Sequence, residues 1–144
     1  MTFRRARCFL LGWGFTDFSG NKSDTLQKVD LSVVANSYCA SELPDPVTDQ
    51  QICTYAPDKD ACLSDSGGPL FWEDDEARKL NLVGIISYGI GCATDKPSVN
   101  TRVTAYLAWI LSETTGNPWL KLAASDYFEC VFLQMLFIAL NRKK

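Results

Sequence analysis

The segment Asp60-Ala-Cys-Leu-Ser-Asp-Ser-Gly-Gly-Pro69 is the most informative stretch of this sequence. It sets one serine, Ser66, between an aspartate and a pair of glycines. Glycine adopts backbone conformations that a Cβ atom forbids, and it lets another backbone approach closely. A serine that attacks a carbonyl group needs a base and hydrogen-bond donors for the oxyanion that forms. A bare Ser-Gly-Gly is typical of a solvated turn, whereas the longer string favours a nucleophile.

The sequence around this segment indicates an all-β protein from Gly12 to Val103. Val29, Leu31 and Val33 alternate with polar residues, which is the period of a half-buried strand. The charged stretch Glu73–Lys79 predicts a hairpin loop. Several short strands at this spacing predict an antiparallel barrel or sandwich. The other expected strands are Gln51–Tyr55, Pro69–Trp72, Leu80–Ser87 and Pro97–Val103.

The two ends of the chain differ from this β-rich middle. Tyr106, Trp109 and Ile110 have helical spacing, so we expect a helix over Thr104–Thr114 with Thr104 as its N-cap. A largely apolar stretch, Tyr127–Leu140, follows and is short for a membrane span. At the start, arginines precede a four-residue apolar run, Cys8–Leu11, whereas a signal peptide needs roughly 7–15. We therefore expect no signal peptide.

Composition excludes several classes of function. The 144 residues carry 14 basic and 17 acidic side chains, a formal net charge of −3, so the electrostatic footprint of a nucleic-acid-binding protein is lacking. The hydrophobic fraction of 47% is too high for a disordered chain. The chain has no histidine, which excludes imidazole metal ligands and imidazole general bases of its own. We expect no metal and no cofactor.

Four landmarks together resemble the C-terminal half of a chymotrypsin-fold, trypsin-like serine protease of the peptidase S1 family. They are Gly12-Trp13-Gly14, Asp65-Ser66-Gly67-Gly68-Pro69, Ser87-Tyr88-Gly89 and the expected helix Thr104–Thr114. Within this family, the sequence resembles the secreted proteases of arthropod venom and haemolymph. The resemblance implies the second antiparallel β-barrel of the double-barrel fold plus the C-terminal helix, with the N-terminal barrel missing. The implied division is a non-family start (1–11), a partial peptidase domain (12–116) and an atypical apolar tail (117–144).

The resemblance also implies roles for individual residues. Ser66 is the nucleophile, and its backbone N–H is one oxyanion donor. Asp65 matches the aspartate that pairs with the α-amino group freed on zymogen cleavage. Asp60 matches the acid at the base of the primary specificity pocket, where a carboxylate favours Arg or Lys at the cleavage site. The segment that pairs with the substrate backbone comprises Ser87, Tyr88 and Gly89.

Three positions depart from the family pattern. Ser64 replaces the glycine that supplies the second oxyanion donor, and losing such a donor typically costs ~10²–10³ in rate. Ser98 replaces a glycine of the pocket wall, so its side chain is expected to narrow the pocket and favour Lys over Arg, or to block it. Tyr88 replaces the usual tryptophan, a milder change.

The six cysteines fit the same register. Family spacing implies the disulfides Cys39–Cys53 and Cys62–Cys92, which require an oxidising compartment. Zinc is the rival use of cysteine, but the sequence has no C-x-x-C pair. Cys8 and Cys130 are left over as free thiols, as mutual partners or as features of an abnormal chain. The usual partner position of Cys8 is occupied by Trp72.

Asn21-Lys22-Ser23 is an N-glycosylation sequon in a polar loop. By resemblance the protein is extracellular, where a glycan could be added. An unmodified surface loop is the alternative.

The family reaction is hydrolysis of peptide bonds after Arg or Lys through an acyl-enzyme on Ser66, with protein substrates and protease inhibitors as partners. The triad order His, Asp, Ser places the first two on the absent N-terminal barrel, so we expect this chain alone to be inactive. The alternatives are a non-catalytic homologue that acts as a decoy and a non-functional fragment. The tail is either non-native coding or a segment that folds back over the exposed face.

Overall fold

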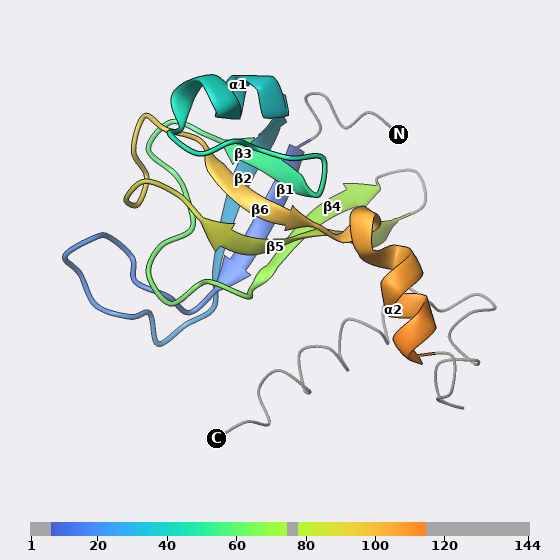
Figure 1. The fold of residues 1–144 in the computed structure, drawn as a ribbon. Helices are drawn as coiled ribbons and strands as arrows, with labels where there is room; N and C mark the ends of the chain where they lie inside the picture. Colours follow the sequence, from blue (N-terminus) through green and yellow to red (C-terminus); the bar gives the residue numbers. More distant parts are fainter. Residues whose placement is uncertain (1–6, 75–77, 115–144) are drawn as a thin grey trace.

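The computed structural model describes residues 7–74 and 78–114, which form a closed antiparallel barrel with strand order β1-β2-β3-β6-β5-β4 (Figure 1). Closure leaves no strand edge unpaired around the barrel. One helix lies between β2 and β3, and a 3-10 turn leads from β6 into the last helix. The elements are β1 (Arg7–Gly12), β2 (Gln27–Val34), α1 (Asn36–Glu42), β3 (Gln51–Tyr55), β4 (Pro69–Asp74), β5 (Lys79–Tyr88), β6 (Ser98–Arg102), η1 (Val103–Tyr106) and α2 (Leu107–Thr114).

Alternation along the strands builds the core. In β2, Leu31 and Val33 are buried while Asp30 and Ser32 face solvent, as the period-2 pattern predicts. Removing such apolar side chains from water is the main favourable contribution to folding. The main cluster inside the barrel comprises Cys8, Leu10, Leu31, Val33, Ile52, Leu70, Val83 and Ile86.

The expected antiparallel barrel is confirmed, and its strands lie close to the predicted ranges. Two elements were not predicted. β1 (Arg7–Gly12) has only a short apolar run after arginines, and it becomes a strand because β2 and β4 flank it on both sides. The helix α1 (Asn36–Glu42) buries only Cys39, so it carries no apolar stripe that a periodicity argument could detect.

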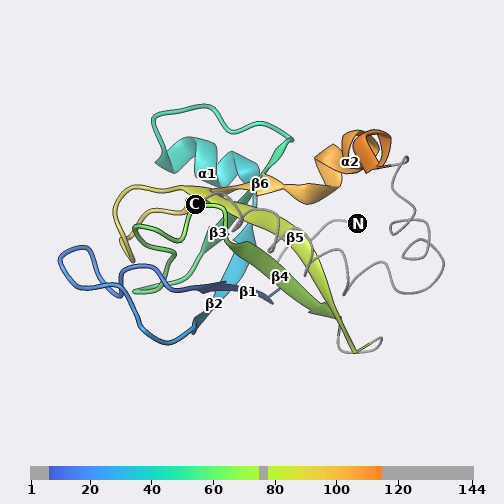
Figure 2. The same cartoon turned by 90° about the horizontal axis from the view of Figure 1, so that it is seen from below.

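The C-terminal helix is present but begins later than expected. Thr104 lies within the 3-10 turn and is therefore not the N-cap of α2, which starts at Leu107. Trp109 is 63% exposed, because the helix extends away from the barrel beyond the end of β6 (Figures 1 and 2). The expectations for residues 1–6, for the tail 117–144 and for Cys130 lie outside the described residues.

Both implied disulfides are formed. Cys39–Cys53 joins α1 to β3 beneath the helix, and both cysteines are fully buried. Cys62–Cys92 joins the segment before β4 to the segment after β5. Each bridge closes a loop of the chain, which restricts the unfolded state and so stabilises the fold.

Cys8 is a free thiol in the barrel core. It lies opposite Trp72 in the β1–β4 register, and its thiol donates to the carbonyl of Leu31 at 3.5 Å. Burial raises the pKa of the Cys8 thiol to about 12, and the negative charge of Asp30 adds to the rise. The thiol is therefore protonated and acts as a small apolar side chain.

Candidate active site

Ser66 lies exposed on the loop that enters β4. The loop is fixed by short hydrogen bonds on both sides of the serine: the Gly68 N–H donates to the Asp65 carbonyl at 2.9 Å, and the Gly67 N–H donates to the Ile86 carbonyl at 2.9 Å. Gly67 has φ of +83°, a left-handed conformation that a glycine adopts without strain. A Cβ atom on Gly68 would lie 2.8 Å from the Asp65 carbonyl oxygen, so the turn that presents Ser66 requires a glycine at both positions.

Asp65 points away from solvent toward the Gly12-Trp13-Gly14 segment. Its carboxylate accepts the Gly14 N–H at 2.8 Å and the Cys62 N–H at 2.9 Å. A Cβ atom on Gly12 or Gly14 would collide with this carboxylate. Sequence reasoning assigned Asp65 to a freed α-amino group and missed these two backbone partners. The spacing of the two glycines is the signal that could have revealed them.

One further backbone contact joins the same two segments, because the Phe15 N–H donates to the Leu63 carbonyl at 2.9 Å. Within the loop itself, the Asp65 N–H donates to the Cys62 carbonyl at 3.1 Å. The loop that carries Ser66 is therefore hydrogen-bonded to the segment that follows β1.

Ser64 adopts φ of +74°, although it is not a glycine. This left-handed conformation carries steric strain for a residue with a Cβ atom. Within residues 7–74 and 78–114, the backbone N–H groups of Ser64 and Ser66 donate no hydrogen bond. Both residues are exposed. Oxyanion holes are commonly built from backbone N–H groups that have no intramolecular partner.

Asp60 forms a second cluster with Ser98 and Gly89. The Ser98 hydroxyl donates to Asp60 Oδ2 at 2.5 Å, and the Ala61 N–H donates to Asp60 Oδ1 at 2.8 Å. A Cβ atom on Gly89 would lie 2.5 Å from Ser98 Oγ. The three residues come from three separate segments, and the fold brings them together. Their roles as the base and wall of a specificity pocket stay a prediction from the resemblance.

Burial raises the pKa of the Asp60 carboxyl above its ordinary value, because desolvation disfavours the charged form. The hydrogen bonds from Ser98 and from the Ala61 N–H offset part of this rise, since they favour the carboxylate. A cationic ligand that contacts Asp60 would relieve the same cost.

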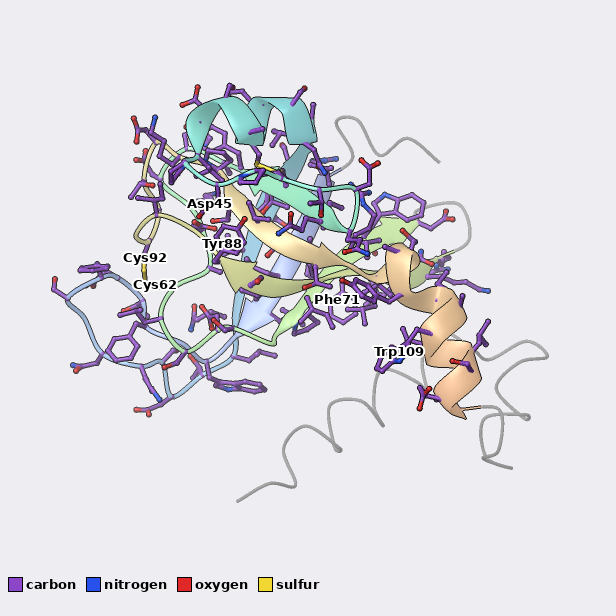
Figure 3. The ribbon with its side chains drawn as sticks, in the orientation of Figure 1. Asp45, Cys62, Phe71, Tyr88, Cys92 and Trp109 are labelled. Carbon is purple, nitrogen blue, oxygen red and sulfur yellow. A yellow bond between two sulfur atoms is a disulfide. The ribbon has the colours of Figure 1, made fainter. Side chains whose placement is uncertain are left out.

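Ser87, Tyr88 and Gly89 form the end of β5 and the residue after it. A register shift lies between Ile86 and Tyr88, so Ser87 has no register partner in β6. Tyr88 pairs with Val99 and is 39% exposed. Figure 3 shows Tyr88 at the end of the barrel that carries the Cys62–Cys92 bridge, away from Trp109 of α2. An exposed strand end of this kind has backbone groups available to another chain.

Asn21, the sequon asparagine, lies on a different loop, between β1 and β2, and is exposed. Among the described residues, no group of three or more histidine, cysteine or acidic side chains is placed to hold a metal ion. In the same part of the chain, no helix has both the length and the apolar character needed to cross a bilayer.

The chain is similar to a known protein family and to several known proteins. The family described as "Trypsin" matches residues 4–110. A venom serine protease of Polistes dominula is 37% identical over 77% of this chain, and venom serine protease 34 of Apis mellifera is 40% identical over 73%. Trypsin-3 of Salmo salar is 37% identical over 77% of this chain.

The chain spans 40%, 25% and 46% of the length of these three relatives, respectively. The match begins before β1 and ends within α2, so it includes all six strands of the barrel and both candidate clusters. The protein belongs to the trypsin family of serine proteases.

Proposed function

We propose that this chain supplies the nucleophile, the oxyanion donors and the specificity pocket of a trypsin-like serine endopeptidase, in the partial peptidase segment 12–116. The observation that carries the proposal is that Ser66 is exposed and that the backbone N–H groups of Ser64 and of Ser66 itself donate no hydrogen bond within the described residues. The general base has to come from a second barrel, because this sequence has no histidine.

The reaction follows from these groups. Ser66 Oγ attacks the carbonyl carbon of the substrate, and its proton passes to the base on the other barrel. The carbonyl oxygen becomes an oxyanion that accepts the N–H groups of Ser64 and Ser66. The C–N bond then breaks as the base returns the proton to the leaving amine, and water later hydrolyses the acyl-enzyme. Asp65 is a positioning residue, because it fixes the segment that carries both donors.

This chain alone is inactive, since it lacks the triad histidine and aspartate. Loss of triad members leaves roughly 10³–10⁴ over the uncatalysed rate even when the oxyanion hole is intact. The test is hydrolysis of fluorogenic Lys and Arg peptides by the purified chain and by Ser66→Ala. The expected result is no turnover from either protein. Turnover that Ser66→Ala abolishes would overturn the inactivity, and turnover that survives it would overturn the role of Ser66.

We further propose that the pocket prefers Lys to Arg. A guanidinium ion binds a carboxylate best through both oxygens, whereas an ammonium ion acts as a point charge. In this chain the Ser98 hydroxyl already donates to Asp60 Oδ2 at 2.5 Å, in the space beside Gly89. Asp60 therefore cannot offer both oxygens freely to a guanidinium ion, and the binding that remains suits the smaller ammonium ion of Lys.

The specificity is tested by binding, which needs no base. Nuclear magnetic resonance titrations with n-butylamine and with benzamidine compare a Lys-like and an Arg-like cation. We expect the chain to favour n-butylamine, Ser98→Gly to strengthen benzamidine binding about tenfold, as one charge-assisted hydrogen bond predicts, and Asp60→Asn to weaken both. Unchanged binding of both cations in Asp60→Asn would overturn the assignment of the pocket. An unchanged ratio of n-butylamine to benzamidine affinity in Ser98→Gly would overturn only the preference for Lys over Arg.

We propose an extracellular location, supported by the two disulfides and by relatives named as venom proteases. The alternative function is a non-catalytic homologue that captures substrates or inhibitors. The assembled contact of Asp60, Ser98 and Gly89 in a chain without histidine favours it. Binding of a protein trypsin inhibitor by the isolated chain, lost in Asp60→Asn, would support this alternative.

A further inference from the structure

The loop between β1 and β2 carries a feature that the proteolytic site does not use. Residues 13–26 extend from the barrel (Figure 1), and Asn21-Lys22-Ser23 within them is the only N-x-Ser/Thr sequon in the sequence. Asn21 and Lys22 are exposed. We propose that Asn21 is an N-glycosylation site whose glycan shields the Lys22–Ser23 bond.

The backbone of this loop is ordered around the sequon. Lys22 forms an antiparallel bridge with Phe15, and the Thr16 N–H donates to the Asn21 carbonyl at 3.2 Å. A turn precedes Asn21, closed by the Gly20 N–H on the Asp17 carbonyl at 3.3 Å. Asn21 is thus presented directly after a tight turn, at an exposed position of a surface loop where a bulky glycan fits.

Among the described residues, the Asn21 side chain does not stabilise the fold through hydrogen bonds. Within the described ranges, its amide makes no hydrogen bond, whereas Asn36 donates to two carbonyls, those of Thr48 and Gln51. Attachment of a glycan to Asn21 therefore breaks no intramolecular bond. The proposal rests on the proposed extracellular location, because the glycan is added in the secretory route.

The loop also supports the nucleophile segment. The Ser23 N–H donates to the Gly14 carbonyl at 3.0 Å, and the Gly14 N–H donates to Asp65. Cleavage after the exposed Lys22 would cut this support in a protease family that acts on basic residues. A glycan one residue before Lys22 hinders such a cut.

The experiment expresses the full chain in insect cells behind a secretion leader. Variants are Asn21→Gln and Ser23→Ala, which remove the sequon, and Ser23→Thr, which keeps it. We expect a glycoform in the wild type and in Ser23→Thr, and its complete loss in the other two. Peptide-N-glycosidase treatment should convert Asn21 to Asp, which mass spectrometry detects at that residue.

Absence of a glycan from the wild-type chain would overturn the site. Disulfide formation is measured in the same samples. A chain with both disulfides but without a glycan would overturn the glycosylation site alone, whereas a chain without disulfides would count against the proposed extracellular location. Added trypsin should cut after Lys22 more slowly in the glycosylated chain than in Asn21→Gln. Equal rates would overturn the shielding.

Discussion

The two ends of the barrel differ in how their exposed residues are supported. At the end that carries Ser66, a disulfide, two backbone bonds to Asp65 and the contact of Ser98 with Asp60 fix each loop. At the other end, α2 leaves the barrel with no buried residue. Its Leu107, Trp109 and Leu111 are 42%, 63% and 49% exposed.

The difference shows that the barrel fixes the loops around Ser66 by its own bonds, whereas it leaves the apolar side chains of α2 exposed. The loops of the site are fixed by bonds within residues 12–98, so their geometry belongs to this barrel. No apolar side chain of α2 is fully buried, and large exposed apolar patches commonly mark interaction surfaces.

Two aromatic substitutions give the largest contrast. Phe71 is 8% exposed and its ring lies 5.5 Å from that of Phe9, so Phe71→Ala should cost about 3–5 kcal/mol of unfolding free energy. Trp109→Ala, the matched exposed aromatic, should change it by no more than about 0.5 kcal/mol. Urea denaturation measures both. A large loss in Trp109→Ala would show that α2 packs on the barrel.

The disulfide at the site end gives the next effect. Replacing both Cys62 and Cys92 by alanine should cost about 2–4 kcal/mol, because the bridge restricts the unfolded chain over a separation of 30 residues. Denaturation of the double variant, with the Cys39–Cys53 bridge intact, measures the loss. Chemical shifts of Tyr88 should move and those of α2 should not. Equal changes at both ends would contradict local support.

Crowding Asp65 should have a moderate effect. Gly14→Ala brings a methyl group into the carboxylate, and overpacking of this kind costs about 1–3 kcal/mol. In the double variant Gly14→Ala/Asp65→Ala the clash is gone, so the two losses should be less than additive. Strict additivity in the denaturation free energies would show that the two residues do not touch.

The smallest effect concerns the charge of Asp60. Because its folded pKa is raised, the folded state binds the proton more tightly, and stability is lost as pH rises through that folded value. Asp60→Asn should therefore be more stable than the wild type above the folded pKa, and the gain should vanish below the ordinary value of 3.8. Urea denaturation across pH, with the exposed Asp45→Asn as control for net charge, measures it. A gain confined to low pH would reverse the assigned sign.

The sequence predicted the barrel and the clusters for different physical reasons. The period-2 alternation of β2 is a local signal, whereas β3 and β6 each bury three consecutive residues and show no such alternation. β1 carries no such signal, because its pairing with β2 and β4 is non-local. α1 is too polar and too short to stand out. The start of α2 was misjudged because a 3-10 turn and an α-helix share their apolar spacing closely.

The site residues came mainly from family landmarks, and the structure adds their partners. The contact of Ser98 with Asp60 joins residues 38 positions apart, which a single sequence does not encode visibly. The bond from Gly14 to Asp65 spans 51 positions. The sequence shows only that Ser64 stands where the family has glycine. Its φ of +74° explains the family's glycine, because this left-handed conformation strains a residue with a Cβ atom.

Amide hydrogen exchange, followed residue by residue in the isolated chain, tests most directly whether the site end is preformed. The account predicts protection at Gly14, Gly67 and Gly68, whose N–H groups are bonded, and fast exchange at Ser64 and Ser66, whose N–H groups donate no hydrogen bond within the described residues. Uniformly fast exchange over the whole loop would contradict it, since the loop would then not be held by this barrel. Protection at Ser64 or Ser66 would equally contradict it, because a donor already engaged cannot receive the substrate oxygen.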